Sequence, residues 1–458
     1  MGTVSEQLSV LEPATEQELA SVPRADASAV DEAVARAKAA WPAWAAVSPA
    51  DRAKLLRQLV TVMEDHHEEL SLLEARNAGK PIGSARGEIG MAIETFRYMA
   101  GGIERPHGET IPVAGGMAFT VREPMGVVGL ITPWNFPLAI ACWKLAPALA
   151  AGNTVVLKPA ELTPLTAVRF GELALEAGIP EGVVNVVVGP GRTCGNRLVE
   201  HPDVAKIAFT GSTEVGASIA QGAASTIKRV TLELGGKSAN IVFADADIEA
   251  AATAAPWAVF DNAGQDCCAR ARILVERSAV DDFLAALKPA VEAIKVGDPL
   301  ADGTEMGPLI SAAQRESVGA FVDGNAEVAI QGTVPDGPGF WFPPTVLHPI
   351  DAGHPAVRDE IFGPVAVIVP FEGEDEALQI ANDTIYGLSG SIWSRDGAKA
   401  LRVARGVQGG NLSINSNSSV RVNTPFGGFK QSGYGRELGP HAADAYSEVK
   451  TIFISTAS

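Results

Sequence analysis

The stretch VVGLITPWNFPLAIACWKLAPALAAGNTVVLKP, residues 127–159, decides the fold class of this chain. It begins with a short apolar run, VVGLIT, and ends with a second one, TVVLKP at 154–159. Between them, residues 139–150 read as a helix that Gly152 ends. Two buried strands joined by a helix form a βαβ unit, from which parallel sheets are built.

Alternation of strands and helices continues along the chain. Apolar, β-branched runs at 183–189 and 204–211 predict strands, and helices are expected near 164–177 and 192–200. Residues 27–100 carry Ala, Leu and Val at helical spacing and predict helices. Short strands between helices indicate a Rossmann-type parallel sheet that is buried on both faces.

A second alternating series starts near residue 239. Strands are expected at 239–244, 271–276, 365–372, 389–394 and 410–415, with helices at 279–294 and 396–406. This series predicts a second α/β domain at about 236–431. The tail YSEVKTIFIS (446–455) predicts an edge strand without a covering helix, which would pair with another chain or with a distant arm.

Charge and composition exclude several classes of protein. The chain has 458 residues, 47% of them hydrophobic, and a formal net charge of −18, which argues against binding to nucleic acid or to anionic membranes. The longest uncharged apolar stretch, 127–143, contains Pro133 and Pro137 and predicts a strand and a helix start rather than a membrane span. The acidic N-terminus has no apolar signal-peptide core.

The cysteines bear on both redox compartment and chemistry. Cys142, Cys194, Cys267 and Cys268 are too few for a disulfide framework and show no zinc-ligand spacing, so we expect a cytoplasmic protein without a metal. Two of them are adjacent in NAGQDCCARAR, 262–272. Cys267 follows a glycine-containing loop at the expected start of an element, where a thiol nucleophile has to be exposed. A buried, unreactive cysteine is the alternative.

Three other stretches place polar groups beside strands. Asn135 in ITPWNFP (131–137) lies in a turn where its amide would either donate to a developing oxyanion or cap the next helix. Glu233 in LELGGKSANIVF (232–243) is either a general base beside two glycines or an ordinary strand-end glutamate. FTGSTEVG (209–216) opens a helix whose N–H groups, with Ser212, would hold a pyrophosphate. GPGRTCG (189–195) is interpreted as a connecting loop, because its third glycine is one residue late for a dinucleotide motif.

Taken together, these stretches have a familiar order and spacing. ITPWNFP, VVLKPAELTP, FTGSTEVG, LELGGKSANIVF, GQDCCA, EIFGPV and PFGGFKQSGYGRELG follow one another along the chain. In this, the chain resembles the aldehyde dehydrogenase superfamily over roughly residues 10–456.

The resemblance implies a division of catalytic roles. Cys267, rather than Cys268, would attack the aldehyde and form a thiohemiacetal, whose oxyanion the Asn135 amide and the Cys267 backbone N–H would hold. Hydride transfer would leave a thioester, and Glu233 would activate water to release the acid. Lys144 and Glu437 match positions of a proton path behind Glu233.

The same resemblance implies the cofactor residues. Lys158 and Glu161 would contact the adenine ribose, and the charge of Glu161 would repel a 2′-phosphate, so NAD is favoured over NADP. Trp134, Gly211 and Ser212 would line the adenine and pyrophosphate side. Glu360 and Phe362 would bind the nicotinamide ribose and ring.

By the resemblance, the architecture has three parts and assembles into oligomers. An NAD-binding domain would span 1–105 and 125–235, and a catalytic domain 236–431. An oligomerisation arm would comprise 106–124 and 446–457. A homodimer or homotetramer is expected.

The substrate loop NSNSSVRVNTPFGG (415–428) lacks the aromatic residue that many relatives place before PFGG. Arg421 in this loop would either recognise a substrate carboxylate or lie at a surface or interface. Trp143, Cys268 and Phe426 would line the tunnel for a small-molecule aldehyde. Two rival functions remain: a CoA-acylating semialdehyde dehydrogenase, disfavoured by Glu233, and a catalytically silent cofactor-binding scaffold.

Overall fold

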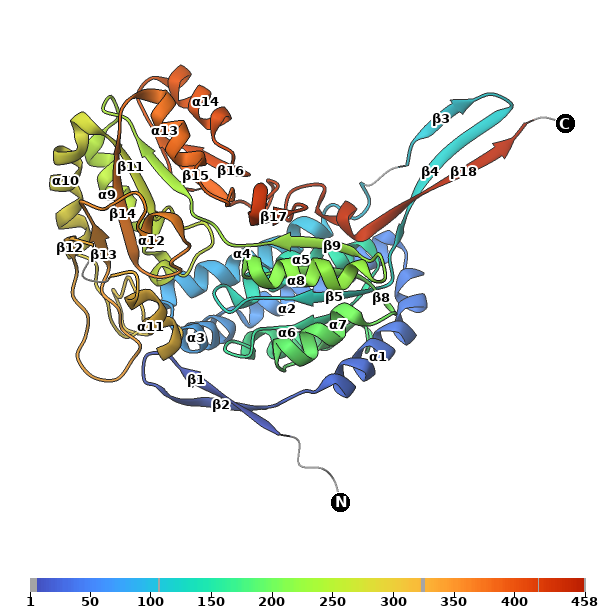
Figure 1. The fold of residues 1–458 in the computed structure, drawn as a ribbon. Coiled ribbons are helices and arrows are strands. Elements are labelled where there is room, and N and C mark those ends of the chain that lie inside the picture. Colours follow the sequence, from blue (N-terminus) through green and yellow to red (C-terminus); the bar gives the residue numbers. More distant parts are fainter. Residues whose placement is uncertain (1–5, 106–107, 323–325, 419, 457–458) are drawn as a thin grey trace.

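The computed structural model describes residues 6–105, 108–322, 326–418 and 420–456. Two mainly parallel sheets, each covered by helices, lie side by side, and a slender three-stranded arm projects away from the first of them (Figure 1). The α/β fold class predicted from the alternating strands and helices is therefore confirmed. None of the described helices is both long enough and apolar enough to cross a membrane.

The first sheet has the order β17-β9-β8-β5-β6-β7, and all its neighbouring strands except β17 and β9 run parallel. Its strands are β5 (Val127–Ile131), β6 (Thr154–Lys158), β7 (Val184–Val186), β8 (Val204–Thr210), β9 (Arg229–Glu233) and β17 (Gly433–Tyr434). The chain passes from β5 to β6 on one side and later returns to β8 on the other. The carboxyl ends of β5 and β8 therefore form a topological switch point, where ligands bind in open α/β sheets.

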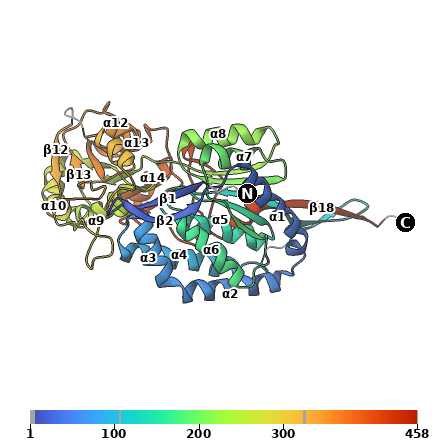
Figure 2. The same cartoon turned by 90° about the horizontal axis from the view of Figure 1, so that it is seen from below.

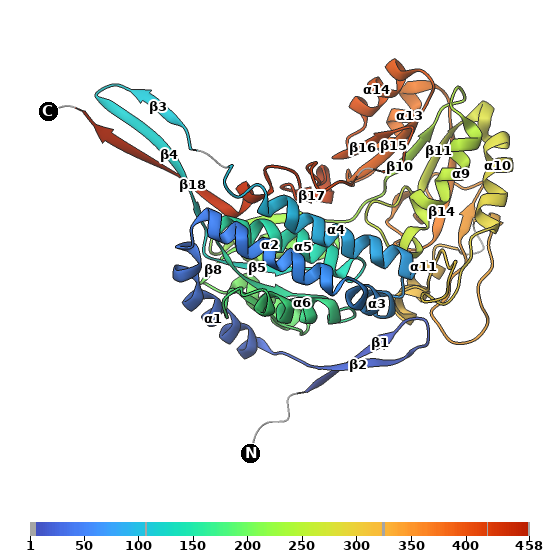
Figure 3. The same ribbon diagram turned by 180° about the vertical axis from the view of Figure 1, so that it is seen from behind.

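Helices cover both faces of this sheet because its strand residues alternate between two cores. Val128 and Leu130 of β5 join the core with α5 and α6, whereas Val127 and Ile131 join the core with α1, α7 and α8. Figure 3 shows α2 and α4 as a further layer outside α5. These helices are α1 (Ala27–Ala45), α2 (Pro49–Asp65), α3 (His67–Ala78), α4 (Ile82–Ala100), α5 (Pro137–Ala151), α6 (Leu165–Glu176), α7 (Asn196–Glu200) and α8 (Thr213–Ala224).

The second sheet has the order β12-β13-β14-β11-β10-β15-β16, and only β12 runs antiparallel to its neighbour. Its strands are β10 (Ala239–Val242), β11 (Arg272–Glu276), β12 (Val328–Gln331), β13 (Thr345–Leu347), β14 (Val365–Phe371), β15 (Ser389–Trp393) and β16 (Asn411–Ile414). One core packs it against α9 and α10, and another packs it against α13 and α14. The helices of this part are α9 (Ile248–Val259), α10 (Val280–Glu292), α11 (Ala312–Gly319), α12 (Pro355–Arg358), α13 (Gly373–Asn382) and α14 (Gly397–Gly406).

The tail forms the expected edge strand. β18 (Ser447–Ser455) pairs antiparallel with β4 (Gly116–Pro124), which pairs in turn with β3 (Thr110–Val113). This sheet extends beyond the helical layers, with its outer strand β18 unpaired on one side among the described residues (Figure 1).

An N-terminal hairpin, which the sequence patterns did not predict, runs underneath the two sheets (Figure 2). It consists of β1 (Gln7–Glu12) and β2 (Gln17–Pro23). At its tip, the Pro13 carbonyl accepts a hydrogen bond from the Phe340 N–H at 3.1 Å, and the Glu16 carboxylate accepts one from the Gly339 N–H at 2.9 Å. The hairpin thereby links the N-terminal helices to the second sheet's loops.

Three local predictions differ from the structure. The strand expected at 183–189 is only Val184–Val186, and the helix expected at 192–200 begins with a π-helical turn, Gly191–Gly195. Cys267 lies in a turn between a 3₁₀ helix, Asp261–Gly264, and β11, and not at the start of a regular element. Asn262 and Ala263 have positive φ angles of 49° and 56°, so the chain bends too sharply here for an α-helix to begin.

Candidate active site

A cleft of about 310 Å³ lies at the switch point of the first sheet and reaches the second. Its walls come from the ends of β5, β8 and β9, from the turn with Cys267, from α11 and from the segment after α12. The lining residues are Pro133, Trp134, Asn135, Thr210, Gly211, Ser212, Leu234, Gly235, Cys267, Gln314, Ser317, Glu360, Ile361 and Phe362. The structure therefore brings together seven of the predicted site residues that are distant in sequence.

Asn135 is held as an amide donor and does not cap a helix. α5 has Phe136 at its N-cap position and no side-chain hydrogen bond caps it, so Asn135 does not have the capping role considered from the sequence. The Asn135 Nδ2 instead donates to the Gln265 carbonyl at 2.9 Å, and its Oδ1 has no hydrogen-bond partner among the described residues. One N–H of the amide is thus anchored, and the other remains for a ligand oxygen.

Cys267 faces the cleft beside two other chemically active groups. Ligand atoms of Asp266, Cys267 and Cys268 lie within 4.8 Å of one another, and Asp266 accepts a hydrogen bond from the Cys268 N–H at 2.8 Å. A hydrogen bond from the Cys267 thiol to the neighbouring Cys268 sulfur, burial, and the charges of Cys268, Asp266 and Glu233 hold the pKa of Cys267 well above its usual value. All four cysteines are free thiols. Asp266, Cys267 and Cys268 are close enough to act as metal ligands, but we interpret Cys267 and Cys268 as a pair of thiols.

Glu233 is an unusual strand-end glutamate. It is the last residue of β9 and only 2% exposed, and neither carboxylate oxygen has a hydrogen-bond partner among the described residues. Burial and the charge of Glu437 raise its pKa well above the ordinary value. A buried, unpartnered carboxylate of raised pKa has the properties of a general base.

Lys144 and Glu437 form a buried ion pair next to Glu233. The Lys144 Nζ contacts the Glu437 carboxylate and donates to the Thr210 hydroxyl at 2.7 Å. Both side chains are almost fully buried, at 0% and 2% exposure. Glu437 and Lys144 are the groups whose charges act most strongly on Glu233, so the three ionisable groups form one buried cluster, and the proton path stays a prediction.

The nicotinamide-side residues cluster on the other wall of the cleft. Glu360 accepts a hydrogen bond from the Gly236 N–H at 2.9 Å, and burial raises its pKa to about 7. A side chain at Gly235 would put its Cβ 2.3 Å from the Glu360 carboxylate, so glycine is needed for this approach. The Trp134 and Phe362 rings meet edge to face at 5.1 Å. Trp134 and Phe362 thus form one aromatic wall of the cleft, and the expected contact of Trp134 with the adenine and pyrophosphate side stays a prediction.

The start of α8 closes the cleft opposite these aromatic rings. Gly211 follows β8, and Ser212 caps the helix by accepting from the Val215 N–H at 3.4 Å. The helix has twelve residues, Thr213–Ala224, so its first N–H groups and its dipole favour an anion at this end. The cleft thus offers a carboxylate that can accept from ribose hydroxyls, aromatic rings that can pack against a flat ring, and a helix N-terminus that can bind a phosphate. This combination fits a dinucleotide.

Lys158, the last residue of β6, and Glu161, which follows that strand, are not among the residues that line this cleft. The Lys158 Nζ donates to the Pro159 carbonyl at 2.7 Å, and the charge of Glu161 acts on the pKa of Lys158, which burial lowers. The π-helical turn Gly191–Gly195 adjoins them, since a Cβ at Gly195 would lie 3.8 Å from Lys158 Cδ. The glycine-rich stretch interpreted as a connecting loop is therefore next to the expected ribose contacts.

An apolar cluster lies on the substrate side of Cys267. Trp143 and Phe426 pack at 5.3 Å between ring centroids. The cluster comprises buried Ile140, Trp143, Cys268, Leu388, Phe426 and Leu438, with Met91, Phe136, Cys267 and Val420 partly buried against it. Arg421 is not part of it, because it is exposed and donates to the Ser418 carbonyl at 3.3 Å.

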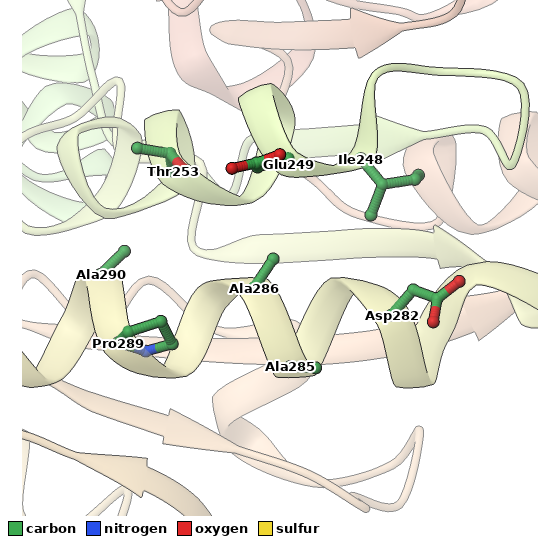
Figure 4. A pocket seen from close by; sticks show the side chains of 8 residues that line it. All are labelled: Ile248, Glu249, Thr253, Asp282, Ala285, Ala286, Pro289 and Ala290. Carbon is green, nitrogen blue, oxygen red and sulfur yellow. The ribbon is translucent and has the colours of Figure 1, made fainter.

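A larger groove elsewhere lacks catalytic groups. It has a volume of about 640 Å³ and lies between α9 and α10. Figure 4 shows that alanines and Pro289 form much of its lining, with the carboxylates of Glu249 and Asp282 on opposite helices. No cysteine, histidine or lysine is among its lining residues, so the smaller cleft is the active-site candidate.

Several residues around Asn135 and Phe362 were missed from the sequence. Asn262, Gln265 and Lys80 contact Asn135, and Gln314 donates from α11 to the Phe362 carbonyl at 2.8 Å. Asn262 and Gln265 belong to the quoted cysteine segment, so their position beside Cys267 was an available signal. Lys80 and Gln314 carry no local signal, because only tertiary packing brings them to the site.

Comparisons with known proteins agree with this geometry. The aldehyde dehydrogenase family model matches residues 2–452. The NADP/NAD-dependent aldehyde dehydrogenase PuuC of Escherichia coli is 43% identical over 460 residues, covering 98% of this chain and 93% of that protein. Betaine aldehyde dehydrogenase of Bacillus subtilis is 41% identical, with coverage of 98% and 94%. The NAD+ complex of aldehyde dehydrogenase from Bacillus cereus superposes with a TM-score of 0.96 at 41% identity, covering 99% of this chain and 94% of that one.

Sequence similarity and fold similarity thus extend over almost the whole length, including every segment that builds the cleft. The chain belongs to the aldehyde dehydrogenase family.

Proposed function

We propose that the chain oxidises an aldehyde to the carboxylic acid, with NAD as the hydride acceptor and Cys267 as the nucleophile. The observation that supports this most strongly is that Cys267 and Asn135 line one cleft with dinucleotide-type groups, while buried Glu233 directly precedes its lining residues Leu234 and Gly235 and acts on the pKa of Cys267. Solved relatives bound to NAD, such as the Bacillus cereus enzyme, support the cofactor assignment.

The first chemical step belongs to Cys267 and Asn135. The sulfur attacks the carbonyl carbon and forms a thiohemiacetal, after the thiol has lost its proton. The free N–H of the Asn135 amide and the Cys267 backbone N–H stabilise the oxyanion that develops. Bound NAD supplies the hydride acceptor.

The second step belongs to Glu233. The thioester left on Cys267 is hydrolysed by water, whose proton Glu233 accepts as the C–S bond breaks. Because the Lys144–Glu437 pair adjoins Glu233, it offers a route for that proton away from the cleft. Glu360 and Phe362 orient the nicotinamide end, and the start of α8 carries the pyrophosphate.

The preference for NAD over NADP rests on Glu161. Its carboxylate, next to Lys158, would accept from the ribose hydroxyls and repel a 2′-phosphate. The Escherichia coli relative is named as NADP/NAD-dependent, so we propose a preference and not an exclusion.

The apolar cluster beside Cys267 favours a neutral, apolar aldehyde. Trp143, Phe426 and Leu438 present no charged group to a substrate, and Arg421 is exposed. The test is kcat/KM over aliphatic, aromatic, amino- and carboxy-aldehydes, with Arg421→Ala as the control for carboxylate recognition. A carboxy-aldehyde as the best substrate, with a large loss in Arg421→Ala, would contradict this assignment.

The rival functions are separated by product analysis. Oxidation yields free acid and one NADH per aldehyde, whereas a CoA-acylating enzyme would yield acyl-CoA only when CoA is present. A scaffold would bind NAD and form no NADH with any aldehyde. Either of these two results would overturn the proposed function.

We also propose the three-part organisation and an oligomer. The NAD-binding domain would be 1–105 and 125–235, the catalytic domain 236–431, and the arm 106–124 and 446–457, of which 106–107 and 457 lie outside the described residues. Free cysteines fit a reducing, cytoplasmic location.

The arm supports the oligomer through its exposed apolar side chains. Val449, Phe453 and Ile454 of β18 are 57%, 54% and 48% exposed, which favours a homodimer or homotetramer. Light scattering after gel filtration tests this: Phe453→Lys should weaken assembly, whereas Leu175→Lys, at a site of similar 55% exposure on α6, should not. A monomeric unmodified chain would refute it.

A further inference from the structure

The backbone carbonyl of Asn135 is held by two buried side chains from different parts of the chain. The Lys80 Nζ donates to this oxygen at 2.8 Å, and the Asn262 Nδ2 donates to it at 2.9 Å. The Asn135 side-chain amide is itself bound to the Gln265 carbonyl. The residue that offers the oxyanion donor is thus fixed at both its backbone and its side chain.

Burial of the charged Lys80 side chain costs free energy, because the charge loses its contact with water. Its side chain is fully buried, forms an ion pair with Glu88, and lies over the Phe136 ring at 4.5 Å from the centroid. A buried ion pair is weak evidence of stabilisation, because desolvation offsets most of the attraction. The pair therefore calls for an explanation other than stability.

The turn that carries Lys80 packs closely against loops of the second half of the chain. It follows Gly79, which has a φ of 77° and whose Cβ would lie 3.1 Å from both Pro13 and Pro308. The Gly79 carbonyl lies against Gly307, where a Cβ would come within 1.8 Å of it. The Ile82 N–H donates to the Pro299 carbonyl at 2.8 Å. The position of the Lys80 Nζ is thus set by packing against the second half of the molecule.

We propose that Lys80, together with Asn262, is a positioning residue that keeps the Asn135 amide aligned with the oxyanion formed on Cys267. This inference rests on the proposed function, since it acts through the oxyanion donor. A hydrogen bond that is made mainly in the transition state affects kcat more than KM. Misplacement of a reacting group by about 1 Å costs up to ~10²-fold in rate, so we expect a loss of ~10–100-fold in the first turnover.

The main variant is Lys80→Met combined with Glu88→Gln. Methionine keeps much of the lysine's length without a donor, and glutamine prevents an unpaired carboxylate from remaining. Glutamine keeps the shape of Glu88 and removes its charge together with that of Lys80, so no unpaired buried charge is left. The matched control is Lys228→Met, because the buried Lys228 Nζ also donates to a backbone carbonyl, that of His201 at 2.7 Å, away from the cleft.

The experiment is a double-mutant cycle with Asn135→Ala, measured as the single-turnover rate of NADH formation. If Lys80 acts through Asn135, Lys80→Met/Glu88→Gln slows NADH formation in the enzyme that has Asn135. The same pair of replacements causes little further loss of rate when residue 135 is already alanine. Lys228→Met should leave the rate unchanged in both backgrounds. KM for the aldehyde should change much less than kcat.

The outcomes separate this inference from the function on which it rests. A normal rate in Lys80→Met/Glu88→Gln, or losses that add in full to that of Asn135→Ala, would overturn the positioning role alone. No loss in Asn135→Ala itself would overturn the oxyanion assignment. If the Lys80 variant does not fold, Asn262→Gly decides, since glycine tolerates the φ of 49° and removes the other donor. Its loss should also vanish when Asn135 is alanine.

Discussion

Replacing Glu233 by glutamine separates the two halves of the proposed reaction. The Glu233 side chain is 2% exposed, and its carboxylate oxygens have no hydrogen-bond partner among the described residues. Glu233→Gln therefore breaks no hydrogen bond within this part of the chain. A Cβ at Gly427 would lie 2.7 Å from the Glu233 Oε1, which shows how closely the pocket fits a side chain of this size. Glutamine keeps the shape and removes the basic oxygen.

The size of the effect follows from the role of a general base. Such groups contribute about 10²–10⁴-fold to a rate, which corresponds to about 3–5 kcal/mol in the barrier for thioester hydrolysis. The attack by Cys267 and the transfer of hydride do not need this base. Glu233→Gln should therefore complete its first turnover and then stall at the thioester.

Rapid mixing with NAD and an apolar aldehyde is the assay. We expect a burst of about one NADH per active site, followed by a steady rate ~10²–10⁴-fold below that of the unmodified enzyme. Asn135→Ala is the control, because it should slow the first turnover and abolish the burst. A Glu233→Gln enzyme that keeps its steady rate, or one that shows no burst and no intact thioester by mass spectrometry, would refute this reasoning.

The remaining predictions concern the nucleophile, the cofactor and pH. Cys267→Ala should abolish NADH formation while Cys268→Ala retains most of it, and the reverse result would mean that the other sulfur is the nucleophile. Glu161→Ala should raise kcat/KM with NADP relative to NAD, and an unchanged ratio would remove the argument from charge repulsion. Because burial raises the pKa of Glu360 to about 7, protonation below that pH should weaken NAD binding, measured by fluorescence titration. Glu360→Gln should show a flatter pH dependence, and equal slopes would assign the effect to another group, such as the nearby Lys237, whose pKa burial lowers to about 7.

Long regular elements were predictable because their patterns are local. The short β-branched run of β5 and the longer Ala- and Leu-rich run after Pro137 indicate a strand and a helix by their length and composition, and both are observed. β7 is shorter than expected because apolar residues alone do not reveal where strand pairing ends. The N-terminal hairpin was missed because its strands are largely exposed: β1 alternates between exposed and less exposed residues, but only one of them is buried, and none is buried in β2.

The site was predictable in its members but less so in its geometry. Motif order identified Cys267, Asn135 and Glu233, but it did not indicate that the Asn135 amide would be anchored to Gln265. It also did not indicate that the Trp134 ring would contact Phe362, because this contact joins segments that are far apart in sequence. Contacts of this kind depend on tertiary packing and leave no trace in a local pattern.

Catalytic geometry in this fold depends on how the two sheets meet. Asn135 follows β5 of the first sheet, whereas its partners Gln265 and Asn262 precede β11 of the second. The proposed oxyanion donor and nucleophile therefore come from the two sides of the boundary between the sheets, and a shift of one domain relative to the other would change the distance between the amide and the sulfur. Close contacts such as that of Gly307 with the Gly79 carbonyl leave no room for such a shift. The tight packing at this boundary is thus part of the catalytic machinery, because it determines the distance over which the amide acts on the oxyanion.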